Sequence, residues 1–260
     1  MRMFCTVLLL VMASTVGCSG FQPVRLQLSP GARIGILNVL EQQMTHVAVG
    51  SLRFDSFTKA YTVDWGIPGY INRTIENDLR ARGNYTVIPL AADAPAGWKQ
   101  SMSDGILSAV NGWMPGDLKA FLKQAGEEKR VDVIISVSSY DTRPSQEGGC
   151  FEIAQNAVIT KGYGLYTKTS VLSGLSNLLP VGQNTAMPYA NIIVAVFQPQ
   201  PGTLAAYGQA PCSKSSLPDF PWPADLQFLG PAQINPLKPQ VEQLSKDAAQ
   251  TALGNAGLLP

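Results

Sequence analysis

The chain has 260 residues, of which 14% are charged, compared with about 25% in an ordinary soluble domain. Lysine and arginine total 19 and aspartate and glutamate 18, so there is no basic excess to hold a nucleic-acid backbone. A single histidine excludes a metal site built from several histidines. The apolar content of 45% is that of a folded chain, and the length suits one large domain.

The N-terminal segment has the layout of a secretory signal. Arg2 gives a positive start, a short apolar run covers residues 4–13, and small residues follow. The run is too short to span a bilayer as a permanent helix. Thr15-Val16-Gly17-Cys18 resembles the bacterial lipobox, in which the cysteine takes a diacylglycerol and the chain is cut just before it. The alternative is an ordinary secretory signal with an incidental cysteine.

The lipobox resemblance implies a signal peptide over residues 1–17, a lipidated Cys18 and a short polar tether over residues 18–31. Ser19 stands where an aspartate usually retains such proteins in the inner membrane, so the resemblance favours the outer membrane. Residues 32–260 are predicted to form a single domain. No later stretch is apolar over eighteen residues, so the mature body is expected to be tethered to the membrane and not to cross it by a helix.

Two cysteines remain in the predicted domain after Cys5 leaves with the signal and Cys18 takes the lipid. Cys150 and Cys212 would lie in an oxidising compartment, which favours a disulfide bond between them. The bond would close a loop of about 60 residues, which stabilises the fold by about 4 kcal/mol on the chain-entropy model. The alternative is a reactive or metal-binding thiol, although no C-x-x-C motif lies nearby.

The first half of the domain alternates strand and helix patterns. Residues 33–40 are nearly continuous in apolar character, as in a buried strand. Residues 46–54 and 57–65 alternate with period two and predict a hairpin, with Asp55-Ser56 at the turn. A helix over residues 68–82, closed by Gly83, is predicted from an apolar stripe: Ile67, Ile71, Ile75 and Leu79.

The second half continues with strands and a proline-rich arm. After a strand at residues 84–90 and a weak helix at 102–113, a firmer helix is predicted over 115–129 and a central strand over 131–137. Further strands are predicted at residues 153–170, 189–197 and 203–207. Residues 198–235 form the proline-rich arm, and Asn235 and Pro236 are expected to begin a C-terminal helix over 236–257.

The helix at residues 68–82 and the strand after it carry the most distinctive pattern. Ile71, Ile75 and Leu79 are followed by Gly83-Asn84-Tyr85 and Val87-Ile88-Pro89. This stretch resembles one found in bacterial envelope lipoproteins such as the curli-secretion pore lipoprotein, activators of penicillin-binding proteins and the N-terminal domain of TolB. Residues 118–139, a helix followed by the strand Val-Asp-Val-Ile-Ile-Ser-Val, fit the same group. The resemblance covers residues 34–197 and implies an architecture, in a group that mostly binds and assembles.

The sequence predicts no catalytic residue, metal site or cofactor. His46 is the single candidate for a general base of neutral pKa, and no G-x-S-x-G motif is present to supply an activated serine. Because His46 opens a predicted strand after a polar turn, we expect it to face solvent or to cap the strand. Glu76 and Asp78 lie two apart on a helix and therefore point to different sides.

Two segments are candidates for partner contact. The predicted loop over residues 171–187 is apolar and includes Leu175, Leu178 and Leu179, which either pack on the core or face a partner or the membrane. In the curli-secretion family, insertions between strands form a membrane barrel in the oligomer, but this loop lacks the sustained alternation of such a segment. Phe220 and Trp222 of the proline-rich arm either cover the edge of the sheet or wrap a neighbour.

The sequence therefore predicts an α/β (α+β) fold: a mixed β-sheet with helices packed on it, a β-hairpin elaboration and a proline-rich arm. We expect a lipoprotein anchored to the outer membrane, facing the periplasm and acting as a non-catalytic binding or assembly factor. Its partners would be unidentified envelope proteins or further copies of the chain. The alternatives are a structural subunit of an oligomeric secretion or export complex, and an envelope enzyme.

Overall fold

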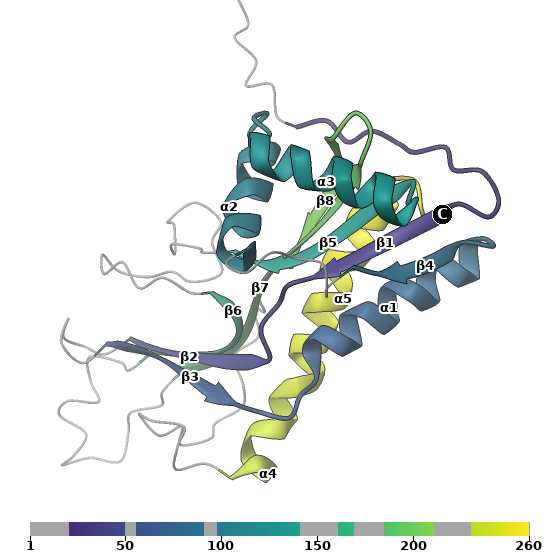
Figure 1. The fold of residues 1–260 in the computed structure, drawn as a ribbon. Helices are drawn as coiled ribbons and strands as arrows, with labels where there is room; N and C mark the ends of the chain where they lie inside the picture. The colour runs from purple at the N-terminus through teal and green to yellow at the C-terminus, as the bar shows by residue number, and fades with distance from the viewer. Residues whose placement is uncertain are drawn as a thin grey trace, which may run out of the picture.

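The computed structural model describes residues 21–49, 56–90, 98–140, 161–168, 185–210 and 230–259. These residues form a curled mixed β-sheet with helices on both faces, which confirms the predicted α/β fold (Figure 1). The strands are β1 (Arg33–Asn38), β2 (Gln43–Val49), β3 (Phe57–Thr62), β4 (Thr86–Pro89), β5 (Val133–Ser139), β6 (Gly162–Lys168), β7 (Thr185–Gln198) and β8 (Thr203–Gln209). The helices are α1 (Ile67–Arg82), α2 (Trp98–Val110), α3 (Gly116–Lys129), α4 (Pro231–Ile234), the 3₁₀ turn η5 (Asn235–Leu237) and α5 (Lys238–Asn255).

The long strand β7 is shared by the two parts of the sheet. Its first half pairs with β6, and its second half pairs with β5 and β8, all antiparallel. β1 runs parallel to β5, and β2, the next strand of the chain, runs parallel to β6. The sheet therefore continues from one part to the next through β7 and through the short connection between β1 and β2.

The part of the sheet that contains β1, β4, β5, β8 and the second half of β7 is the core of the fold. β1 lies between β4 and β5 and is parallel to both. The chain reaches β4 through α1, and then reaches β5 through α2 and α3. One apolar cluster joins the sheet to α1 and α5, and a second joins it to α2 and α3. The helices thus cover opposite faces of the sheet, as Figure 1 shows.

Helix α1 follows the sequence pattern closely. All four residues of the predicted stripe are buried, because their spacing by four places them on one face of the helix. The helix begins one residue before Pro68 and ends at Arg82, and the backbone N–H of Gly83 donates to the carbonyl of Leu79. The antiparallel pairing of the predicted hairpin is confirmed for β2 and β3, but its register is not: a turn at Asp55-Ser56 would place Phe54 opposite Phe57, whereas Ala48 lies opposite Phe57.

The start of the C-terminal helix differs from the prediction. Asn235 is not its N-cap, because Asn235 Oδ1 accepts a hydrogen bond from Trp65 Nε1 at 3.2 Å. α4 and η5 precede α5, whose N-cap residue is Leu237. The side chain that the sequence assigns to the helix end instead satisfies a buried indole, a long-range contact that local capping rules do not contain.

Strand β7 begins earlier than the sequence pattern indicates. Its first residues, Thr185 to Met187, fall in the segment predicted as a loop, and Pro188 lies inside the strand. Proline lacks an N–H and is tolerated where a strand has one neighbour. In the described residues this half of β7 pairs with β6 alone, so the strand accommodates Pro188.

Residues 21–31, hereafter the N-terminal strap, lie on the body and do not stand off from it as a free tether. Val24 N donates to Ala205 O at 2.7 Å, Leu26 N to Ala256 O at 2.8 Å, and Gly31 N to Asn84 O at 3.0 Å. The side chain of Leu26 is buried in the cluster that α5 shares with the sheet. Apolar residues inside a polar segment therefore bind the strap to the domain.

Candidate functional site

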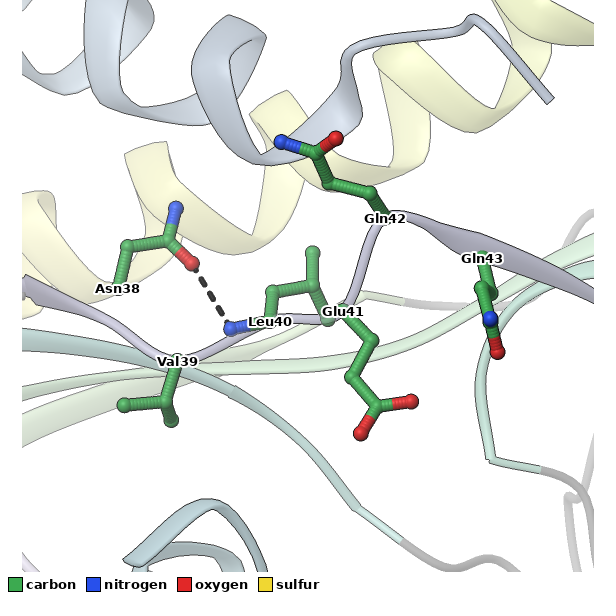
Figure 2. Close-up of a pocket in the computed structure, with 6 residues that line it drawn as sticks. All are labelled: Asn38, Val39, Leu40, Glu41, Gln42 and Gln43. Carbon is green, nitrogen blue, oxygen red and sulfur yellow. Dashed lines mark hydrogen bonds between the residues drawn. The ribbon is translucent and has the colours of Figure 1, made fainter. Parts of the chain in front are cut away.

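A pocket of about 590 Å³ lies where β1 passes into β2. Among the described residues, six consecutive ones line it, as Figure 2 shows: Asn38, Val39, Leu40, Glu41, Gln42 and Gln43. We call this feature the junction pocket. It opens where one part of the sheet ends and the other begins, because β1 pairs with β5 whereas β2 pairs with β6.

Asn38 fixes the course of the chain through the junction. Its Oδ1 accepts a hydrogen bond from the backbone N–H of Leu40 at 3.0 Å, drawn as the dashed line in Figure 2. Its Nδ2 donates to Pro68 O at 3.0 Å and to Asn72 Oδ1 at 2.8 Å. One amide side chain therefore ties the end of β1 to the first turns of α1.

The lining side chains alternate between the two faces of the sheet. In Figure 2, Asn38, Leu40 and Gln42 point to one side of the chain, whereas Val39, Glu41 and Gln43 point to the other. Glu41, Gln42 and Gln43 are exposed. On one side of the chain Glu41 and Gln43 together offer both acceptors and donors, Gln42 offers an amide on the other side, and the volume lies in the range of ordinary ligand pockets. The lining suits the binding of a polar ligand or a peptide segment.

The order of the strands in the sheet also supports a binding site at the junction pocket. In open α/β sheets, ligands bind outside the carboxyl ends of the strands, at the point where successive connections leave to opposite sides. β1 is that point here, because β4 lies on one side of it and β5 on the other, with their connecting helices on opposite faces. The junction pocket lies at the carboxyl end of β1.

Two buried serines of β5 lie on the same side of the sheet as α2. Ser136 and Ser138 are fully buried, and their hydroxyls have no hydrogen-bond partner within the described part of the chain. Ser136 is opposite Leu37 of β1, one residue before the junction pocket begins. A buried hydroxyl without a partner costs about 1–3 kcal/mol. The two hydroxyls are therefore polar groups without partners in the described structure, and they lie on the α2 side of the sheet near the junction pocket.

His46 is buried, and the prediction that it faces solvent or caps a strand is wrong. β2 begins three residues earlier than the sequence pattern suggests, so His46 lies inside a strand that is flanked by β3 and β6. Its Nε2 lies 2.8 Å from Thr167 Oγ1, and its ring meets that of Phe57 edge-on at 5.3 Å. The imidazole does not line the junction pocket.

Within the described ranges, no cluster of three or more His, Cys, Asp or Glu side chains could hold a metal ion. None of the helices in those ranges is long and apolar enough to cross a membrane.

The side chains that the sequence singles out for lipidation, disulfide formation and partner contact lie outside the described residues: Cys18, Cys150, Cys212, Leu175, Leu178, Leu179, Phe220 and Trp222. Their roles stay predictions.

Sequence patterns did not predict the junction pocket. The available signal was a polar interruption, Asn38 and then Glu41-Gln42-Gln43, between two strand patterns. An asparagine at the end of an apolar run also fits an ordinary turn. Its contact with Asn72 joins residues 34 positions apart, which no local pattern reveals.

No protein-family model matches the chain, and a search of curated proteins finds no match.

Proposed function

We propose that the chain is a lipoprotein that is anchored at Cys18 on the periplasmic side of the bacterial outer membrane. We propose further that it acts as a non-catalytic binding or assembly factor. The observation that carries the anchor is Thr15-Val16-Gly17-Cys18 after a short apolar run. A diacylglycerol with an additional acyl chain gives firm anchoring, because each buried methylene contributes about 0.8 kcal/mol.

The junction pocket is the proposed binding site. Its position at the carboxyl end of β1 and its lining of amides and one carboxylate support recognition of a polar partner segment. A non-catalytic role is supported by the position of the single histidine, which is buried in β2 beside Thr167. General acid–base chemistry at neutral pH most often uses histidine, and the pocket has none.

The binding role is tested by photo-cross-linking in intact cells. A photoreactive amino acid replaces Gln43, which points to the same side of the chain as Glu41, and in a matched control it replaces the exposed Gln243 on α5. We expect a discrete cross-linked product from position 43 only, identified by mass spectrometry. Glu41→Lys should reduce the yield of this product, because the change reverses the charge beside position 43 at an exposed residue and does not disturb the core.

The outcomes separate the candidate functions. A product that contains an envelope protein supports the proposed role. A product that contains only this chain, accompanied by a stable large oligomer in detergent, favours a structural subunit instead. Equal labelling from positions 43 and 243, or labelling insensitive to Glu41→Lys, contradicts a binding site at the junction.

A further inference from the structure

We propose that the N-terminal strap determines which side of the protein faces the bilayer, and that this side comprises the strap, the outer edge of β8 and the α2–α3 connection. The occupant of this surface is the phospholipid headgroup layer. The inference rests on the proposed lipid anchor at Cys18.

The strap is held along its length. Phe21 packs against Tyr207 of β8, with ring centroids 5.4 Å apart, and Val24 N donates to Ala205 O of the same strand. Beyond β8, the strap continues to the turn after α5, where Leu26 N donates to Ala256 O. It thus crosses the edge of the sheet, from the cluster of α2 and α3 to the cluster of α1 and α5.

The chain between the anchor and the strap is short. Cys18 precedes Phe21 by three residues, so their Cα atoms are at most about 11 Å apart whatever the conformation between them. Helix α5 alone, with 18 residues, is about 27 Å long. A lipid on Cys18 therefore keeps Phe21 near the headgroups, whereas it does not by itself hold the N-terminal end of α5 there.

Two exposed apolar side chains indicate how the protein is oriented about Phe21. Within the described residues, the exposed large hydrophobic side chains are Val24, 51% exposed, and Trp113, 66% exposed. Val24 belongs to the strap, and Trp113 to the α2–α3 connection. Val110 and Met114, which flank Trp113 in sequence, share one apolar cluster with Phe21. In Figure 1 this connection lies near the start of the described chain.

The chemistry of these side chains suits the membrane interface. Tryptophan is enriched at the headgroup level, where an apolar ring and a polar N–H are both accommodated. The exposed Val24 adds apolar area on the N-terminal strap. Contact of Val24 and Trp113 with the bilayer would hold the β8 edge toward the membrane and leave α4, at the other end of α5, pointing away (Figure 1).

The test uses the full-length lipoprotein, extracted from membranes and reconstituted in vesicles of phosphatidylethanolamine and phosphatidylglycerol. A small fluorophore is attached through an azide-bearing amino acid, in one variant at Thr251 and in a matched variant at Ala232. Both positions are exposed, and Thr251 lines a hollow with Phe21 whereas Ala232 lies on α4. Quenching by a lipid with a spin-labelled headgroup then reports contact-range proximity.

We expect the fluorophore at Thr251 to be quenched at least about twofold more than the one at Ala232. A flexible Gly/Ser insertion of about 12 residues before Phe21, which spans about 20 Å, should remove this difference when combined with Trp113→Ser. Circular dichroism and thermal unfolding establish that each variant is folded.

The intact mass of each sample separates the two ways of failing. Lipid on Cys18 with equal quenching at both positions, or with a difference that survives the combined variant, overturns the orientation and leaves the anchor standing. Absence of lipid on Cys18 overturns the proposed anchor and the orientation with it.

Discussion

Several polar side chains lie inside the apolar body of this protein, and their partners differ from one residue to the next. Tyr163 is 1% exposed and stacks on Trp65, with ring centroids 6.3 Å apart, yet its hydroxyl has no hydrogen-bond partner in the described structure. Ser136 is in the same situation, whereas the ring of His46 is bonded through Thr167. These residues make distinct contributions to stability that substitutions can separate.

Ser136→Ala should raise the free energy of unfolding by about 1 kcal/mol, because the substitution removes a buried hydroxyl that has no partner and leaves little empty space. Chemical denaturation of the wild type and the variant measures the change. A clear drop in stability would show that the hydroxyl is satisfied in the folded protein and would contradict the account of β5.

Thr167→Val should lower the free energy of unfolding by about 1–3 kcal/mol, because His46 Nε2 loses the oxygen that lies 2.8 Å away inside the protein. Thr58→Val is the matched control: Thr58 is exposed on β3, so the same substitution there should be nearly neutral. Equal effects of the two substitutions would contradict a structural role for the Thr167 hydroxyl.

Tyr163 should also make stability sensitive to alkaline pH. Burial raises the pKa of Tyr163 from 10.0 to about 12. Between these values the unfolded chain releases a proton that the folded chain keeps, so the free energy of unfolding falls as pH rises through this window. Below pH 10 this residue adds no pH dependence. Tyr163→Phe should flatten the fall, as measured by denaturation at successive pH values, and an unchanged slope would contradict this.

Elements of the fold are joined by close backbone contacts as well as by apolar stripes. β8 packs on α5 at Gly208, where a Cβ would collide with the carbonyl oxygen of Ala248 and lie 2.7 Å from the amide nitrogen of Ala252. Glycine lets the helix approach the strand at this point. The contact holds α5 against the edge of the sheet that the N-terminal strap crosses.

Gly208→Ala should therefore lower the free energy of unfolding by about 1–3 kcal/mol, since neither backbone can move away freely. Gly254→Ala, on the same helix α5, meets no atom within 4 Å and should raise stability by about 0.5–1 kcal/mol. Thermal unfolding of both variants checks the pair. If both substitutions changed the free energy of unfolding in the same direction, this would contradict the close approach of α5 to β8 at Gly208.

Local patterns predicted those elements whose residues are buried by regular spacing. The four-residue repeat of α1 and the apolar density of β5 identify both, because period and burial agree there. The patterns failed where a distant residue decides the outcome, as for Asn235 with Trp65 and His46 with Thr167. Such pairs are separated by more than a hundred residues, and no window of sequence contains both members.

At the pairing of β1 with β5, sequence patterns predicted the two strands but not the contacts that hold them together. Asp132 is the aspartate of the strand Val-Asp-Val-Ile-Ile-Ser-Val, and its physical role comes from the fold. Asp132 Oδ2 accepts a hydrogen bond from Arg33 N at 2.8 Å, and Arg33 Nε donates to Arg130 O at the end of α3. The starts of two parallel strands and the end of a helix are thereby fixed together. The junction pocket at the other end of β1 depends on this register, and sequence patterns contain neither contact.

For the molecule as a whole, the fold separates two surfaces. The junction pocket lies at the carboxyl end of β1, and the strap crosses the edge at β8. An anchor at Cys18 would hold the strap side near the lipid and leave the pocket to bind another component of the envelope. This division of roles depends on the lipid, because the N-terminal strap restricts orientation only if the chain before it is attached to a membrane.

The intact mass of the protein extracted from the membranes of a Gram-negative host tests the anchor most directly. The account predicts a chain that begins at Cys18 and carries the added mass of a diacylglycerol and an acyl chain, and it predicts that Cys18→Ser abolishes this species. A mature chain of unmodified mass, or one cut at another residue, would contradict the account.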